Sequence, residues 1–125
     1  MVIRAGCVYY VADEVVAMPP EQYRTPHDRR TVLVVSGDHR NCDPDWPVVL
    51  ICPVSSGEQG SPYDVKLGAG VAGLKKKGWV RSTLVQPLDK KELQECISLN
   101  GLPSLMLTEV HSKVLRYMDP PLEDL

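Results

Sequence analysis

The sequence predicts a small, mainly β domain that ends in helices. Valine-rich runs dominate the first two thirds of the chain, and β-branched residues of this kind favour strands. Loops rich in Pro, Gly, Asn and Asp separate these runs, and after residue 88 the apolar residues change to helical spacing. A chain of 125 residues has the length of one domain, at roughly 100 to 200 residues per domain.

Three strands are expected where the apolar runs are continuous, at residues 8–11, 32–35 and 48–54. The third run is apolar throughout, which is typical of a strand in the middle of a sheet rather than at its edge. Two further strands are expected at 63–67 and 79–86. The intervening loops are short, so we expect five or six strands that pair antiparallel.

A first helix is expected directly after these strands. Asp89, followed three residues later by Glu92, resembles a capping box at a helix start. Three apolar residues then fall on one helical face: Leu93, Cys96 and Ile97. Asn100 and Gly101 would end this helix.

A second helix is expected to begin at Pro103 and Ser104 and to end before Pro120. Its apolar residues recur at spacings of three and four, which makes one stripe that packs on the sheet: Leu107, Val110, Val114 and Met118. We therefore expect a single domain over residues 1–118 and a short acidic tail over 119–125.

The composition excludes several classes of protein. A hydrophobic content of 43%, a charged content of 24% and a net charge of −2 argue against a disordered or fibrous chain. No apolar run reaches the ~18 to 20 residues of a membrane span, and residues 1–6 lack the apolar core of a secretory signal. We expect a cytoplasmic protein with no membrane partner.

The cysteines, histidines and glycines carry no recognisable cofactor motif. The four cysteines form no C-x-x-C pair, and no two histidines have the spacing of a metal site. Cys7 and Cys52 lie in strand-like runs, which favours buried free thiols over the two disulfides that four cysteines allow. Residues 68–73 match G-x-G-x-x-G, but no helix fits between Gly73 and Gly78, so a surface loop is favoured. We expect neither a metal nor a cofactor.

One segment of the chain is basic. Residues 65–88 contain five lysines or arginines and no acidic residue, a local charge of 5 − 0 = +5. Such a segment suits a solvated turn, and it also suits a salt-dependent contact with a phosphate backbone. Both interpretations remain open. Four earlier arginines extend the basic surface: Arg24, Arg29, Arg30 and Arg40.

Several short segments of the sequence occur in a recognisable order. They are Ile3 to Val11, Glu21-Gln22, Arg30 to Ser36, Cys52 to Ser56, Pro62 to Leu67, Gly73-Leu74, and Asp89-Lys90 with Leu93. In this order they resemble the MazF/PemK family of toxin endoribonucleases. Thr31 stands where that family commonly has proline, and Ser55 where it usually has threonine.

The resemblance implies an SH3-like barrel of the MazF/PemK/CcdB type, normally a homodimer. It also implies the toxin component of a type II toxin-antitoxin system, which binds a cognate antitoxin. The implied activity is that of an mRNA interferase, a metal-independent, sequence-specific endoribonuclease that cleaves single-stranded RNA. The alternative is a catalytically degenerate barrel that acts as a protein-binding module or on a protein target.

The resemblance also assigns site residues. The family's arginine and threonine correspond to Arg30 and Ser55, which would bind and stabilise the phosphate under attack, with Glu21 as a candidate for proton transfer or loop organisation. If the strands at 32–35 and 48–54 are adjacent and antiparallel, Arg30 and Ser55 emerge at one end of the sheet. The candidate RNA-binding residues are Arg29, Arg40, Lys75, Lys76, Lys77 and Arg81.

Overall fold

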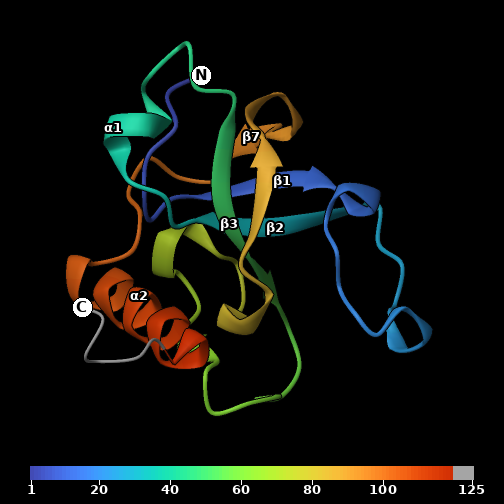
Figure 1. Cartoon of the computed structure of the whole chain (residues 1–125). Coiled ribbons are helices and arrows are strands. Elements are labelled where there is room, and N and C mark those ends of the chain that lie inside the picture. The colour runs from blue at the N-terminus through green and yellow to red at the C-terminus, as the bar shows by residue number, and fades with distance from the viewer. Residues whose placement is uncertain (120–125) are drawn as a thin grey trace.

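The computed structural model describes residues 1–119, which form a seven-stranded antiparallel sheet with a long C-terminal helix packed beside it (Figure 1). The strands are β1 (Val8–Ala12), β2 (Arg29–Val34), β3 (Val48–Ser55), β4 (Val65–Leu67), β5 (Gly78–Val80), β6 (Gln86–Asp89) and β7 (Glu95–Cys96). The helices are α1 (Asp38–Asn41) and α2 (Ser104–Met118). The prediction of a mainly β, antiparallel domain is therefore confirmed.

Strand β3 is the centre of the sheet. Residues 51–54 of this eight-residue strand pair with β2 along one edge, while β6 and β5 share the other edge. β6 pairs with residues 48–51 of β3, and β5 pairs with residues 54 and 55. The full strand order is β4-β5-β3-β2-β1-β7, with β6 beside β3.

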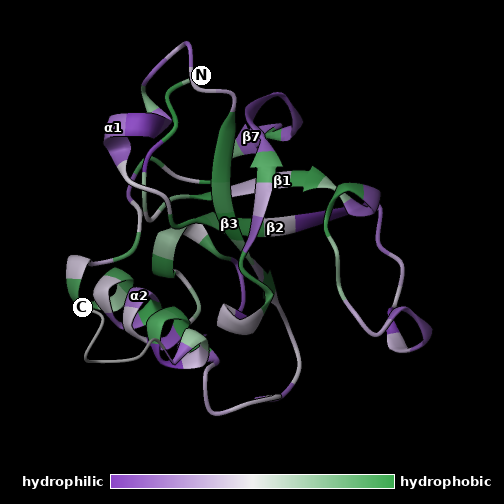
Figure 2. Cartoon of the chain, in the orientation of Figure 1, coloured by the Kyte–Doolittle hydropathy of each residue, from purple (hydrophilic) through white to green (hydrophobic). Residues whose placement is uncertain are grey.

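Both faces of the central strands are buried over most of their length, with Leu50 of β3 exposed, which explains their continuous apolar runs. Alternating side chains of β1, β2 and β3 supply two separate cores, because successive residues of a strand point to opposite faces. Figure 2 shows β3 as hydrophobic along its length. One core holds Tyr9, Val11, Val32, Val34, Val49 and Ile51, and the other holds Val8, Leu33, Cys52, Val54 and, from α2, Val110.

The prediction of a helix from Asp89 to Asn100 is wrong. The Asp89 carboxylate does accept a hydrogen bond from the Lys91 amide at 2.9 Å, but only one 3-10 turn follows, at Lys90–Glu92. The chain then forms β7 and pairs with β1, with the Ile97 amide donating to the Val8 carbonyl at 2.9 Å. The open edge of β1 offers backbone partners that a local capping signal does not reveal.

The strand expected at 79–86 is also interrupted. A 3-10 turn at Ser82–Leu84 separates β5 from β6. The interruption lets the chain move from one end of β3 to the other along the same edge. Seven short strands therefore replace the five or six that we expected, within residues 1–119.

The second helix is confirmed as α2, and its bounds match the prediction closely. Val110 is fully buried and Val114 packs against the same core, but Met118 is 65% exposed, so the predicted packing stripe stops before the end of the helix. The expected tail at 119–125 lies, from residue 120 onward, outside the described residues. No helix within residues 1–119 is long and apolar enough to cross a membrane.

The cysteines are free thiols in the structure, as the sequence favours. Cys7 and Cys52 are buried in the sheet, and desolvation raises the pKa of Cys52 to about 12. Its thiol therefore stays protonated at neutral pH and serves as a small apolar side chain.

Gly101 fixes the approach of α2 to the sheet, and this predicts the effect of a methyl group there. A Cβ at Gly101 would lie 2.7 Å from the Gly6 carbonyl oxygen and 3.2 Å from the Cys7 amide nitrogen. These are backbone atoms that cannot rotate away, so Gly101→Ala should lower the free energy of unfolding by about 1–3 kcal/mol. Urea unfolding measures this. Gly37→Ala is the control, since a Cβ at Gly37 meets no atom within 4 Å; equal losses in both variants would contradict the prediction.

Candidate active site

A groove of about 770 Å³ opens at the end of the sheet where β2 begins and β3 ends. Its walls come from the loop between β1 and β2, which extends away from the sheet in Figure 1, and from the loop between β4 and β5. The lining residues include six cations and no aspartate or glutamate. The cations are Arg24, Arg29, Arg30, Lys75, Lys76 and Lys77. An anionic ligand is the natural occupant of such a groove.

The β2–β3 pairing brings Arg30 and Ser55 together. Thr31 pairs with Val54, so the same register continued by one residue sets Arg30 opposite Ser55. Residues that face each other across an antiparallel pair have side chains on the same face, with Cβ atoms about 4.5–5.5 Å apart. Both residues line the groove, which confirms the expectation that they emerge at one end of the sheet.

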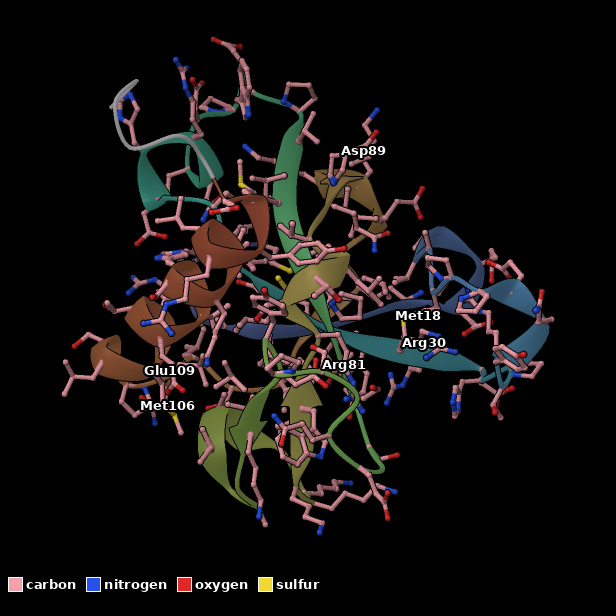
Figure 3. The ribbon with its side chains drawn as sticks, turned by 60° about the horizontal axis from the view of Figure 1, so that its bottom comes forward. Met18, Arg30, Arg81, Asp89, Met106 and Glu109 are labelled. Carbon is pink, nitrogen blue, oxygen red and sulfur yellow. The ribbon has the colours of Figure 1, made fainter. Side chains whose placement is uncertain are left out.

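Arg30 is held rigidly in this position. Its side chain is only 9% exposed; Nε donates to the Asp13 carboxylate at 2.5 Å and Nη2 to the Thr25 carbonyl at 2.8 Å. Within residues 1–119 its Nη1 makes no hydrogen bond. Figure 3 shows Arg30 beside Met18, a second residue of the groove wall.

Asp13 organises this wall, although no motif in the sequence marks it. It follows β1 directly and pairs with Arg24 at 3.1 Å as well as with Arg30. Arg24 also donates to the Val16 carbonyl at 2.6 Å and to the Asp13 carbonyl, which closes the β1–β2 loop on itself. Desolvation disfavours the charged carboxylate, but the hydrogen bonds from Arg24 and Arg30 outweigh it and lower the pKa of Asp13.

Ser55 is held from the opposite side. The Arg81 Nε donates to the Ser55 hydroxyl oxygen at 2.7 Å, and the Arg81 Nη1 pairs with Asp64 at 2.6 Å. Ser55 is thus an acceptor toward Arg81. Within residues 1–119 it donates its own proton to no protein group.

The other predicted site residues divide into two groups. Lys75, Lys76 and Lys77 line the groove, and so does Arg29, whose guanidinium lies 3.5 Å from the centre of the Tyr10 ring. Glu21, Arg40 and Arg81 are not part of the lining. Among the latter, the Glu21 side chain is 74% exposed and lies 3.5 Å from Arg24.

Arg40 and Arg81 are engaged within the protein. Arg40 pairs with Asp43 at 3.1 Å and covers the Trp46 ring at 4.8 Å, beside a different hollow. The Arg81 side chain is 14% exposed and its partners occupy all three of its nitrogens.

The groove also holds aromatic and imidazole side chains that no sequence motif marks. Tyr10, Tyr23 and His27 line it, and Tyr23 is 79% exposed. Exposed aromatic rings among cations suit the stacking of nucleic-acid bases. Among the described residues, no group of three or more His, Cys, Asp or Glu side chains is arranged to hold a metal ion.

The Asp13 cluster predicts a pH-dependent contribution to stability. A carboxyl whose pKa is lowered on folding stabilises the protein above its unfolded pKa, near ~3.9, and this contribution is lost as pH falls through the folded value. Asp13→Asn should therefore be less stable than the parent at pH 7. The difference between their free energies of unfolding should become smaller below about pH 4. Urea midpoints from pH 7 to pH 2.5 measure it. Asp28→Asn, in the same loop, is the control; a gap for Asp13→Asn that does not change with pH would contradict the assignment.

The fold and sequence match known toxins. Residues 12–118 match the family model of the PemK-like, MazF-like toxins of type II toxin-antitoxin systems. A chain of the MazE-MazF crystal structure (form II) from Deinococcus radiodurans superposes with a TM-score of 0.71 at 24% identity, covering 97% of this chain and 99% of that one.

Two mycobacterial structures are similar in fold. An endoribonuclease in complex with its cognate antitoxin, from a mycobacterial species, gives a TM-score of 0.66 at 17% identity over 96% of each chain. Mycobacterium tuberculosis toxin MazF-mt6 gives 0.70 at 15% identity, over 92% of this chain and 98% of that one. No curated protein matches the sequence. Since the family model spans most of its length, the chain belongs to the PemK-like, MazF-like toxins of type II toxin-antitoxin systems.

Proposed function

We propose that this toxin is a metal-independent, sequence-specific endoribonuclease that cleaves single-stranded RNA in the cytoplasm. The observation that carries the proposal is the placement of Arg30 opposite Ser55 in a groove lined by six cations. Family membership supports it, as does the endoribonuclease activity named for one of the structural neighbours.

The chemistry follows from the groups that face the groove. The ribose 2′-oxygen attacks the neighbouring phosphorus, the bond from phosphorus to the 5′-oxygen breaks, and the phosphorane between these states carries extra negative charge. The fixed guanidinium of Arg30 and the hydroxyl of Ser55 stabilise that charge by hydrogen bonding. Proton transfer falls to the β1–β2 loop, which carries Glu21 and His27.

RNA binding involves the walls of the groove. Lys75, Lys76, Lys77 and Arg29 contact phosphates and position the strand without reading its sequence. Tyr23, which is largely exposed, offers a stacking surface for a base. Arg40 lies beyond the groove and would contact RNA that extends past it.

We also propose a cognate antitoxin and a second copy of the chain as partners. The solved neighbours include MazE-MazF and an endoribonuclease bound to its antitoxin, which supports the first. A homodimer would lengthen the groove that one small domain offers, and two-fold pairing is the commonest oligomer. Sedimentation distinguishes it from the 13.9 kDa monomer.

The alternative is a degenerate barrel that binds a protein and does not cleave RNA. The test is cleavage of single-stranded RNA by the purified toxin in excess EDTA. Removing one preorganised donor to a developing charge costs about 10² to 10³ in rate, so Ser55→Ala should cut RNA at least about a hundredfold more slowly. Ser55→Thr keeps the hydroxyl and should stay active.

The arginine requires a gentler substitution than alanine. Arg30 is nearly buried against Asp13, so Arg30→Lys preserves the ion pair while removing the second donor of the guanidinium. This variant should also lose about 10² in rate. Arg4→Lys, at an exposed position, is the control. Full activity in Ser55→Ala and Arg30→Lys, or cleavage that stops in EDTA, would favour the alternative.

The lysine run predicts a change in the salt dependence of binding. Replacing Lys75, Lys76 and Lys77 by Gln should weaken RNA binding and flatten the slope of log K against log salt by up to about 2, at ~0.7 per phosphate contact on a single strand. The single-turnover rate at saturating RNA should change little, because these residues position the strand.

The matched control removes three positive charges outside the groove. Lys66, Lys91 and Arg116 are exposed and line no part of it, so their replacement by Gln changes the net charge equally. If the two triple variants share one salt slope, the run acts only through the overall charge.

A further inference from the structure

Arg81 has more intramolecular partners than a surface cation needs. It follows β5, and its guanidinium donates to the Ser55 hydroxyl, to the Asp64 carboxylate and to the carbonyls of Ser56 and Glu58. The two side-chain contacts are short, at 2.7 Å to Ser55 and 2.6 Å to Asp64. Four of its five N–H donors are therefore engaged within the protein, and Arg81 is not among the residues that line the groove.

Asp64 holds Arg81 in place. Its side chain is 3% exposed, and a carboxylate buried to this degree requires compensating donors. It receives them from Arg81 and from the amides of Gly60 and Ser61, at 2.6 and 3.1 Å. The ion pair therefore ties the loop after β3 to the end of β5.

The contact with Arg81 also determines what Ser55 can do. A serine hydroxyl donates one hydrogen bond and accepts two, and its proton rotates freely unless partners constrain it. The Arg81 Nε can only donate, so it occupies a lone pair of the Ser55 oxygen and leaves the proton to point elsewhere. Ser55 lines the groove, and a hydroxyl that accepts from a cation becomes a better donor in turn.

We propose that Arg81 is the positioning residue of this site: it orients the Ser55 hydroxyl to donate into the groove, toward a phosphodiester oxygen, while Asp64 fixes Arg81. The inference deepens the proposed ribonuclease function and rests on the role given there to Ser55. Arg81 then acts through Ser55 and makes no direct contact with RNA. Its positive charge lies near the groove because the guanidinium contacts Ser55 and Asp64.

Arg81→Lys tests the proposal with little change in charge. A lysine offers one nitrogen to Asp64 and cannot also donate in the direction of the Arg81 Nε. The experiment is a double-mutant cycle of the parent, Arg81→Lys, Ser55→Ala and the double variant. Arg116→Lys, on the exposed side of α2, is the control that should match the parent.

The first readout is the single-turnover rate of RNA cleavage at saturating RNA. Ser55→Ala should be about a hundredfold slower and Arg81→Lys about tenfold slower. The double variant should be no more than about twofold slower than Ser55→Ala, since residues that act as a unit are not additive. If the rate losses of the two single variants multiply in the double variant, the inference about Arg81 fails while the ribonuclease proposal stands.

The second readout does not depend on cleavage. A 2′-deoxy oligonucleotide presents the same phosphates but has no 2′-hydroxyl to attack them. Its affinity should fall in Ser55→Ala and in Arg81→Lys, with no further fall in the double variant. If the parent cleaves no RNA, the ribonuclease proposal fails, and this cycle still decides whether Arg81 acts through Ser55. If the double variant binds the 2′-deoxy oligonucleotide more weakly than either single variant, by the sum of their free-energy losses, the inference is overturned.

A third readout covers the case in which Arg81→Lys does not fold. The Nε–H proton of Arg81 in the otherwise unchanged protein should exchange slowly with solvent, and its nitrogen resonance should shift in Ser55→Ala. Ser55→Thr should restore the parent signal and the parent rate. An Arg81 Nε resonance that does not shift in Ser55→Ala would overturn the inference.

Discussion

The pairing of β2 with β3 is the interaction on which the rest of the structure depends. Its register buries alternating side chains in two cores and at the same time sets Arg30 opposite Ser55, one residue beyond the pair of Thr31 with Val54. A slip of one residue would move every side chain of a strand to the other face. The packing of the two cores and the geometry of the site therefore depend on the same register.

Two acidic residues anchor the walls of the groove from behind. Asp13 holds Arg24 and Arg30 on one side, and Asp64 holds Arg81 on the other. Each carboxylate compensates the desolvation of an arginine that is less than one-sixth exposed, and each also ties down a loop. Neither carboxylate lines the groove, so the surface that faces a ligand stays cationic while the interior charges are paired.

The sequence predicts the parts of the fold that depend on local pattern. The valine runs predict β1, β2 and β3, and the apolar stripe from Leu107 to Met118 predicts α2. The expected helix after Asp89 failed because β7 forms by pairing with β1, more than eighty residues away, and a capping signal contains no information on such a partner. Likewise the basic segment revealed the charge of Arg81 but not Asp64, whose position depends on the path of a loop.

The ion pairs of Arg30 and Arg81 contribute both to folding and to the groove. This determines which substitutions can separate an effect on activity from an effect on stability. Arg30 and Arg81 are largely buried donors, paired with the half-buried Asp13 and the buried Asp64, so removing either arginine leaves a carboxylate without its partner and changes stability together with chemistry. Lys75, Lys76 and Lys77 have no ion-pair partner within residues 1–119, and their loss leaves the interior unchanged. Ser55 lies between these extremes, because its hydroxyl is held from within by Arg81 while it faces the groove. A hydroxyl is small and uncharged, so its removal alters the site at the least cost to the fold, and Ser55 is where chemistry and stability separate most cleanly.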